Sequence, residues 1–337
     1  MTDDPRRSVR GPVGASARPS RRPRRHAPPK RRWRPGALLI ITAVLAVIGA
    51  TVLAYSPAAS WLSAYNQSLV ISRYSDSLHK VRPKASEQLT EAHRYNRALS
   101  SGAVLEANVN IPTGSGKSTS DEFDYWKLLD TPNRTMSRIQ IPKIGVDLPI
   151  YHGTSEESLL KGAGHLQGTS LPVGGKDTRS VITAHRGLAD ATMFTDLDKL
   201  QSGDRFILTT FGQVLTYRVV DTRVVDPDDT TTLRQRAGED LVTLVTCTPL
   251  GINTHRILVT GERITPTPPK DVATAKSTTA TLQFPWWAVV YLTAIVLIVV
   301  YTWWAGRSHP KTALPDGKKR SGRRRAPRRK SRDRHGR

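Results

Sequence analysis

The chain contains one cysteine, Cys247, among its 337 residues. A lone cysteine excludes an internal disulfide, so disulfide chemistry does not hold this chain together. Cys247 ends a β-forming run, residues 241–247, and the sequence Thr-Pro-Leu-Gly follows at once. A strand that ends at a Pro/Gly loop can present a thiolate nucleophile to a cleft. The alternative is a small buried side chain, which is the usual fate of a free cysteine.

An arginine stands at a matching place nine residues later. Arg256 opens the next β-forming run, residues 256–260. A two-strand hairpin with the intervening loop would bring Cys247 and Arg256 together at one end. A permanent cation beside a thiol favours the nucleophilic thiolate and can later stabilise an oxyanion.

Thiol catalysis also needs a group that exchanges protons near neutral pH, and histidine is the usual choice. Between the two apolar segments described below, the candidates are His79, His93, His152, His165, His185 and His255. His185 follows the apolar run 180–183 and precedes Arg-Gly, so it too stands where a strand gives way to a loop. His255 adjoins Arg256, and neighbouring side chains in a strand point to opposite faces. His185 is therefore the leading candidate, and the other histidines are interpreted as satisfied polar residues.

Short β-branched runs separated by turn signals must position these residues. They occupy 137–141, 146–150, 180–183, 205–211, 213–220, 241–247 and 256–260. Seven or eight strands at this spacing predict a closed or nearly closed β-barrel. Helical patterns at 156–166 and 192–200 interrupt the strands.

The segments on either side of the barrel have a different character. Residues 58–101 predict one or two helices, with a break at Pro83, and residues 102–120 predict a loop. Residues 265–280 are rich in Thr, Pro and Lys and are interpreted as a tether.

Several motifs closely resemble those of class C, pilus-assembling sortases. They are TLVTCTP at 243–249, NTHR at 253–256, IPKI at 141–144, PIYHGT at 149–154, GAGHLQGTSLP at 162–172 and ITAHRGL at 182–188. The resemblance covers about residues 136–264 in unbroken order. It implies a mainly β fold, a closed sortase-type barrel of seven to eight strands with short helices.

The resemblance also implies roles for three residues. Cys247 resembles the nucleophile that attacks an LPXTG-like sorting signal, His185 the general acid/base, and Arg256 the group that orients substrate and stabilises the oxyanion. An amine, either a pilin lysine or a lipid-linked cell-wall precursor, would resolve the acyl-enzyme. No metal or cofactor is implied, the setting is a Gram-positive cell envelope, and His152, His165 and His255 remain structural.

The sequence departs from this class at one point. Class C sortases commonly carry a lid with an Asp-Pro-aromatic motif, and the corresponding loop near residues 109–124 has no such tripeptide. Ile111-Pro112 and the acidic, aromatic stretch 121–126 are imperfect substitutes, so a degenerate or absent lid is expected.

Two segments without charge, residues 36–55 and 284–305, are long enough to cross a bilayer. The second has tryptophans near both ends, where amphipathic rings favour the headgroup interface. An uncleaved anchor is favoured over a signal peptide for the first, because its apolar run exceeds a typical signal-peptide core.

The net charge of +23 lies almost wholly in the tails, with +10 in residues 1–35 and +12 in residues 306–337. Positive flanks favour the cytoplasmic side. A two-pass membrane protein with both termini cytoplasmic and one external domain is therefore expected. Binding of DNA by the tails is the alternative, but no DNA-binding fold is recognisable, so no nucleic-acid partner is expected.

The predicted organisation has seven segments. They are a basic disordered tail (1–35), a transmembrane helix (36–55), a helical prelude with the lid loop (56–135), the catalytic barrel (136–264), a linker (265–283), a transmembrane helix (284–305) and a basic disordered tail (306–337). Polymerisation of pilins is the favoured function. The alternatives are anchoring of single surface proteins to a peptidoglycan precursor and a non-catalytic membrane scaffold with a sortase-like barrel.

Overall fold

The computed structural model describes residues 33, 35–100, 123–229, 231–277 and 284–307, together with three short strands between residues 103 and 118. The chain divides into two units, and the unit Val44–Ile298 contains the barrel. Most of both basic tails and most of the loop near residues 109–124, where the lid was sought, lie outside the described residues.

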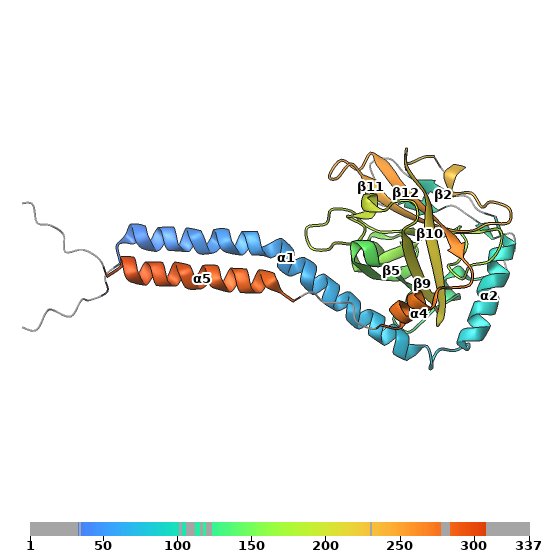
Figure 1. Ribbon diagram of the computed structural model, residues 1–337, viewed down its shortest axis with the longest axis horizontal. Coiled ribbons are helices and arrows are strands. Elements are labelled where there is room, and N and C mark those ends of the chain that lie inside the picture. The colour runs from blue at the N-terminus through green and yellow to red at the C-terminus, as the bar shows by residue number, and fades with distance from the viewer. Residues whose placement is uncertain are drawn as a thin grey trace, which may run out of the picture. The chain divides into compact units, whose positions relative to one another are not determined.

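Eight strands form a closed barrel, which confirms the predicted architecture (Figure 1). They are β5 (Thr135–Ile141), β6 (Val146–His152), β7 (Ala163–His165), β8 (Thr178–Thr183), β9 (Arg205–Thr210), β10 (Gln213–Val225), β11 (Asp240–Thr248) and β12 (His255–Ile264). Their order around the barrel is β10-β12-β11-β8-β7-β6-β5-β9. The β8–β11 and β6–β7 pairs are parallel, and the other pairs are antiparallel.

Alternation along the strands separates an interior from an outer face. The interior is filled by an apolar cluster that includes Ile139, Ile182, Phe206, Leu244 and Val259. Residues of the opposite parity on the same strands belong to a different cluster on the outer face. This parity decides which side chains of β8, β11 and β12 can meet outside the barrel.

Helices flank the barrel in the sequence. α1 (Ala37–Ser77) and α2 (Ala85–Ala98) precede it, α3 (Glu156–Lys161) connects β6 to β7, and α4 (Pro269–Lys276) and α5 (Trp286–Ala305) follow it. Short 3₁₀ turns are η1 (Tyr125–Lys127), η2 (Pro142–Ile144), η3 (Leu197–Lys199) and η4 (Thr231–Leu233). Two small sheets pair β1 (Leu99–Ser100) with β4 (Lys117–Ser118) and β2 (Ala103–Leu105) with β3 (Pro112–Gly114).

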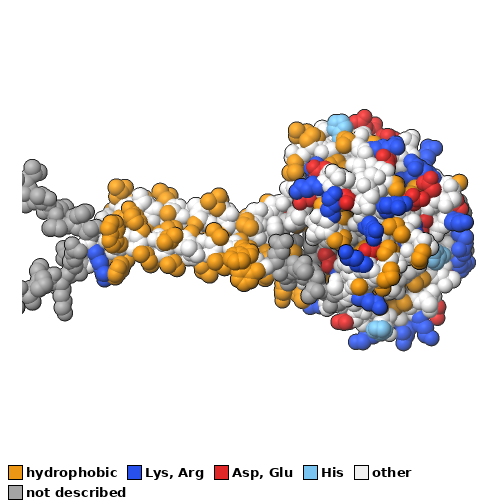
Figure 2. Space-filling view, in the orientation of Figure 1, with side chains coloured by type: hydrophobic (Ala, Val, Ile, Leu, Met, Phe, Trp, Pro, Cys, Tyr) orange, Lys and Arg blue, Asp and Glu red, His pale blue; other side chains and the backbone are white. Residues whose placement is uncertain are grey.

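Among the described residues, two helices are long and apolar enough to cross a membrane, α1 and α5. Figure 2 shows hydrophobic side chains along both of them, whereas acidic and basic side chains mix over the barrel. The sequence predicted that the first span would end at residue 55 and a separate helix would start at 58. Instead α1 is continuous and contains Pro57.

The helix predicted at 156–166 is wrong beyond Lys161. α3 stops at Gly162, and residues 163–165 form the unpredicted strand β7. A Cβ atom at Gly162 would lie 2.6 Å from the carbonyl oxygen of Pro149, and one at Gly164 would collide with Gly153. These glycines allow β7 to pair closely with β6, and this tertiary contact overrides the helical pattern.

The helix predicted at 192–200 is also wrong, apart from the single turn η3. Here backbone groups bond to the preceding loop. Phe194 N donates to His185 O (3.0 Å), and Thr195 O accepts from Arg186 Nε (3.0 Å). The segment 265–280 was interpreted as a tether, but it contains the helix α4.

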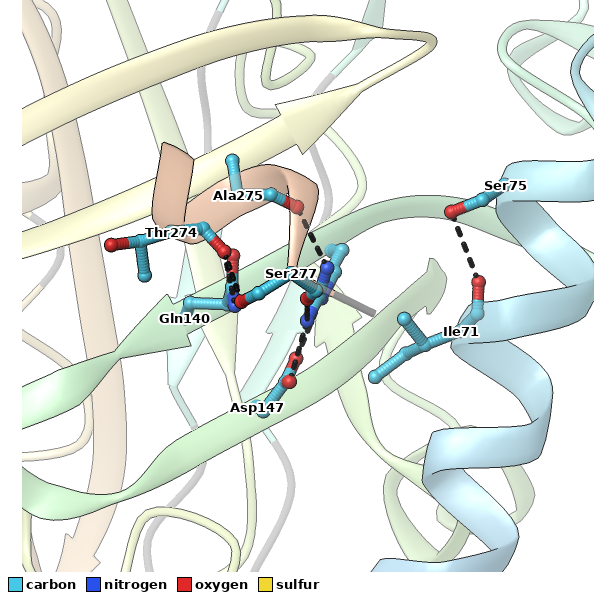
Figure 3. A network of polar contacts seen from close by, with 8 residues as sticks. Ile71, Ser75, Gln140, Asp147, Thr274, Ala275 and Ser277 are labelled. Atoms are coloured by element: carbon cyan, nitrogen blue, oxygen red, sulfur yellow. Dashed lines mark hydrogen bonds and ion pairs between the residues drawn. The ribbon is translucent and has the colours of Figure 1, made fainter. Parts of the chain in front are cut away.

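A buried arginine fastens α4 to the barrel (Figure 3). Arg138 of β5 forms a bidentate ion pair with Asp147 of β6, with nitrogen–oxygen distances of 2.7 and 2.6 Å. The same guanidinium donates to the carbonyl oxygens of Ala275 and Ser277 at the end of α4 (3.0 and 3.1 Å). A cation at a helix C-terminus satisfies carbonyls that have no partner within the helix.

Replacing Arg138 with alanine is expected to lower the free energy of unfolding by about 3–5 kcal/mol, because Asp147 then lacks its counter-ion in a largely buried place. Arg223→Ala is the matched control, since its pair with Asp221 is equally short (2.6 Å) but half-exposed. That control should cost about 0–1 kcal/mol. Thermal unfolding of the full chain in detergent, followed by circular dichroism, measures both, and equal shifts would contradict the prediction.

Candidate active site

Cys247 and Arg256 are direct neighbours across two strands. β11 and β12 are antiparallel, and their register pairs Cys247 with Arg256. Paired residues point to the same face of a sheet, with Cβ atoms about 4.5–5.5 Å apart. The hairpin predicted from the sequence therefore exists, and it brings the thiol and the guanidinium together.

His185 reaches the same end of the barrel from the other side of β11. The parallel β8–β11 register pairs Thr183 with Val245, and two further residues along each chain lead to His185 and Cys247. Hydrogen bonds continue beyond the ladder, from Ala184 N to Val245 O (3.2 Å) and from Thr246 Oγ1 to Ala184 O (2.8 Å). The three predicted residues thus stand at one level on adjacent chain segments.

The three residues also share a face. Val181, Val245 and Leu258 belong to the apolar cluster on the outer face, under Leu233 of the β10–β11 connection. Cys247 lies two residues after Val245, and Arg256 two residues before Leu258, so the strand alternation places both on that face. The site therefore lies on the outer face of the barrel, next to the apolar side chains of Val181, Val245 and Leu258.

Burial and charge act in opposite directions on the thiol and the imidazole. Cys247, His185 and Arg256 are all buried. Burial raises the pKa of Cys247, and the nearby Arg256 partly opposes it. Burial lowers the pKa of His185, and the carboxylates of Glu156 and Asp190 partly oppose it. At neutral pH the resting pair is therefore a thiol and a neutral imidazole, with the thiolate–imidazolium form as a minor population.

The loop between β11 and β12 holds Arg256 by its own backbone. Nη1 donates to Asn253 O (2.8 Å) and to His255 O (3.0 Å). Asn253 has φ of 62°, a left-handed conformation that asparagine tolerates better than most residues. The sequence motif alone gives Asn253 no role, whereas the structure shows that its carbonyl oxygen helps to position the guanidinium of Arg256.

Arg186 is a positioning residue that sequence reasoning missed. Its Nη1 donates to Thr248 Oγ1 (2.9 Å), and its Nη2 lies 2.9 Å from Asp198 Oδ2. The bond to Thr248 joins the segment that carries His185 to the strand that carries Cys247, and the ion pair with Asp198 joins it to η3. The sequence signal that could have pointed to Arg186 is its position as a cation directly after the candidate histidine.

The remaining motif histidines lie in other surroundings. His165 is fully buried and close to Tyr125 OH (3.0 Å), and His152 lies 2.6 Å from Leu128 O through Nε2. His255 is exposed, 3.3 Å from Asp226, and on the opposite strand face from Arg256. These contacts account for the three side chains without a catalytic role.

The pH dependence of thiol-based catalysis at this site is expected to be a broad bell. The competent pair is thiolate plus imidazolium, so activity should fall below the pKa of His185, which lies below its ordinary value of 6.5, and above the pKa of Cys247, which lies above its ordinary value of 9.0. Between these two pKa values, the fraction of molecules in the thiolate–imidazolium form is small and constant. Measurement of kcat/KM from about pH 5 to about pH 10 checks this, and both limbs between 6.5 and 9.0 would contradict it.

Comparisons with known proteins point to one family. A family model described as "Sortase domain" matches residues 139–264. The chain is 33% identical over 131 residues to Sortase D of Bacillus subtilis, an alignment that covers 38% of this chain. It spans 63% of that relative's length, less than two thirds.

Solved structures are similar over nearly their whole length. Sortase C1 of Streptococcus agalactiae is 40% identical, and the match covers 60% of this chain and 98% of that chain with a TM-score of 0.52. Sortase C of Streptococcus pneumoniae is 39% identical, with coverage of 59% and 98% and a TM-score of 0.52. Its structure was described in connection with catalysis and pilin substrate specificity.

Proposed function

Because this chain belongs to the sortase family, we propose that it is a membrane-anchored cysteine transpeptidase in which Cys247, His185 and Arg256 carry the chemistry. The observation that supports the assignment most directly is the strand register. It pairs Cys247 with Arg256 and brings the chain at His185 level with Cys247 on the other side of β11.

The reaction proceeds through a covalent intermediate. The Cys247 thiolate attacks the carbonyl carbon between Thr and Gly of an LPXTG-like signal, and Arg256 stabilises the oxyanion that forms. The carbon–nitrogen bond then breaks, and the departing amine takes a proton from the His185 imidazolium. An acceptor amine gives its proton to His185, attacks the thioester and releases the Cys247 thiolate.

The acceptor is a pilin lysine in this proposal, so that successive transfers build a polymer. Support comes from the similarity to sortases C, one of which is described with pilin substrate specificity. Anchoring of single proteins to a lipid-linked cell-wall precursor uses the same acyl-enzyme and differs only in the amine.

The proposed location is the cell membrane of a Gram-positive cell, with the barrel outside and both termini in the cytoplasm. Two candidate spans flank the barrel in the sequence. The basic residues beyond them favour retention of both tails on the cytoplasmic side.

The test compares cells that produce the chain with cells that lack it. Immunoblots of cell-wall extracts are probed for an LPXTG-bearing pilin. A ladder of high-mass species only in producing cells supports polymerisation, and one wall-linked band that depends on the chain supports anchoring of single proteins. No dependence on the chain in any LPXTG-bearing protein, together with no transfer of an LPXTG peptide to an amine by the purified full chain, contradicts the proposed function.

A further inference from the structure

Two loops beside the candidate site present apolar side chains to solvent. Leu250 and Ile252, in the β11–β12 loop, are 54% and 63% exposed. Leu188, in the loop after His185, is half-buried, and Leu250 packs against Gly187 of that loop so closely that a Cβ atom there would collide with it. We call Leu188, Leu250 and Ile252 the apolar lip.

α1 is fastened to the same loop. Ser56 Oγ donates to Ala189 O at 2.6 Å. Farther along α1, the buried Gln67 lies 3.5 Å from Met193 Sδ through Nε2. Ala189 and Met193 both follow His185 and Leu188 in the chain, so α1 fixes the position of the loop that contributes to the lip.

The bilayer edge on α1 can be placed from the sequence. The almost wholly apolar run 36–55 has 20 residues, which span about 30 Å as a helix and match the hydrocarbon thickness. Ser56 is the next residue. It therefore lies at the boundary between hydrocarbon and the polar headgroups.

α5 gives an independent estimate of the same boundary. Within the unit Val44–Ile298, Thr51 Oγ1 and Tyr291 OH are 3.1 Å apart, and the two helices run in opposite directions there (Figure 1). α5 begins at Trp286, five residues before Tyr291, and five residues after Thr51 is Ser56. Tryptophan favours the headgroup interface, so both helices place the boundary at Ser56.

We propose that the apolar lip lies against the outer surface of the lipid bilayer that holds the chain, so that the candidate site works at the membrane–water interface. Ser56 at the boundary is bonded to the loop that follows Leu188, and the exposed Leu250 and Ile252 adjoin that loop. Contact with lipid removes their apolar surface from water. The inference rests on the membrane anchoring in the proposed function and requires no particular substrate.

Fluorescence quenching by nitroxide-labelled lipids tests the inference. Single cysteines are placed in the full chain with Cys247→Ala, at Ile252→Cys and Ala189→Cys, both exposed positions. Lys176→Cys is the control, because it lies before β8, roughly 20 Å along that strand from Thr183. Leu45→Cys lies within the apolar run of α1 and reports on anchoring itself. Each is labelled with an environment-sensitive fluorophore and reconstituted into phosphatidylcholine–phosphatidylglycerol vesicles.

The lip predicts that shallow nitroxide lipids quench the labels at 252 and 189 at least about twofold more strongly than the label at 176. Deep nitroxide lipids should quench the label at 45 most. If the label at 45 is quenched but the labels at 252 and 189 are quenched no more than the label at 176, the contact between the lip and the bilayer is contradicted and the membrane anchoring by α1 is supported. If 45 is not quenched, α1 is not a span, and both the anchoring and the lip are overturned.

Discussion

Replacement of Cys247 by alanine is expected to remove acyl transfer to the limit of detection, a loss on the order of 10⁶-fold by comparison with removal of a serine nucleophile from a hydrolytic triad. Cys247 is the chain's one cysteine, so no second thiol can substitute for it. Wild type incubated with an LPXTG peptide should gain the mass of the acyl group as a thioester that hydroxylamine releases, and the alanine variant should gain nothing.

The variant Cys247→Ser distinguishes loss of the nucleophile from loss of side-chain packing. Serine keeps the size and the polar atom, yet an alcohol is a far weaker nucleophile than a thiolate, so this variant should also fail to turn over. Because Cys247 is buried, both variants need a folding control, which is the circular dichroism spectrum of the full chain. Normal turnover or a hydroxylamine-sensitive adduct in folded Cys247→Ala would show that the nucleophile lies elsewhere.

The places of the three proposed site residues in the fold could be predicted from the sequence, because each residue stands at the end of a strongly β-forming run. A hairpin between 241–247 and 256–260 brings Cys247 and Arg256 to the same rim, and the two-residue repeat of a strand places residues at every second position on one face. The β11–β12 register and the parallel β8–β11 register then determine how close they come. Among the histidines, the strand end already made His185 the leading candidate, and the resemblance pointed to the same residue.

The parts that failed depend on contacts between distant segments. β7 has three residues, too few for a periodic signal, and it exists because Gly162 and Gly164 permit close backbone approach to β6. α4 was hidden in a Thr/Pro-rich stretch, and its end is held by Arg138, more than a hundred residues earlier. A single-residue pattern contains no information about such partners.

The unbroken course of α1 is another feature that depends on contacts between distant segments. The sequence predicts a span that ends at residue 55, whereas α1 runs unbroken through Pro57 to Ser77. Ser56 and Gln67 supply such contacts through the loop after His185. The helix α1 is thus bonded to the loop that follows the candidate general acid/base, and sequence periodicity could not reveal this contact.

His185→Gln is expected to lower kcat about 10²–10⁴-fold, the usual contribution of a positioned acid/base group. Among the described residues, Nε2 of His185 has no hydrogen-bond partner, although Glu156 Oε1 lies 3.7 Å away, so a ring nitrogen is available for the thiol and the leaving amine. Glutamine retains polarity and approximate size but cannot take up a proton at neutral pH. The bell shape of the pH profile should disappear with it, because the residual rate then depends only on the thiolate and rises with pH toward the raised pKa of Cys247.

His255→Gln is the matched control for this prediction. His255 is adjacent to Arg256 in the chain but exposed and close to Asp226, on the opposite face of β12. Its replacement should leave kcat and both pH limbs unchanged within about twofold. A folded His185→Gln variant that keeps the bell-shaped profile and its rate, or a His255→Gln variant that loses them, would assign the proton transfer to a residue other than His185.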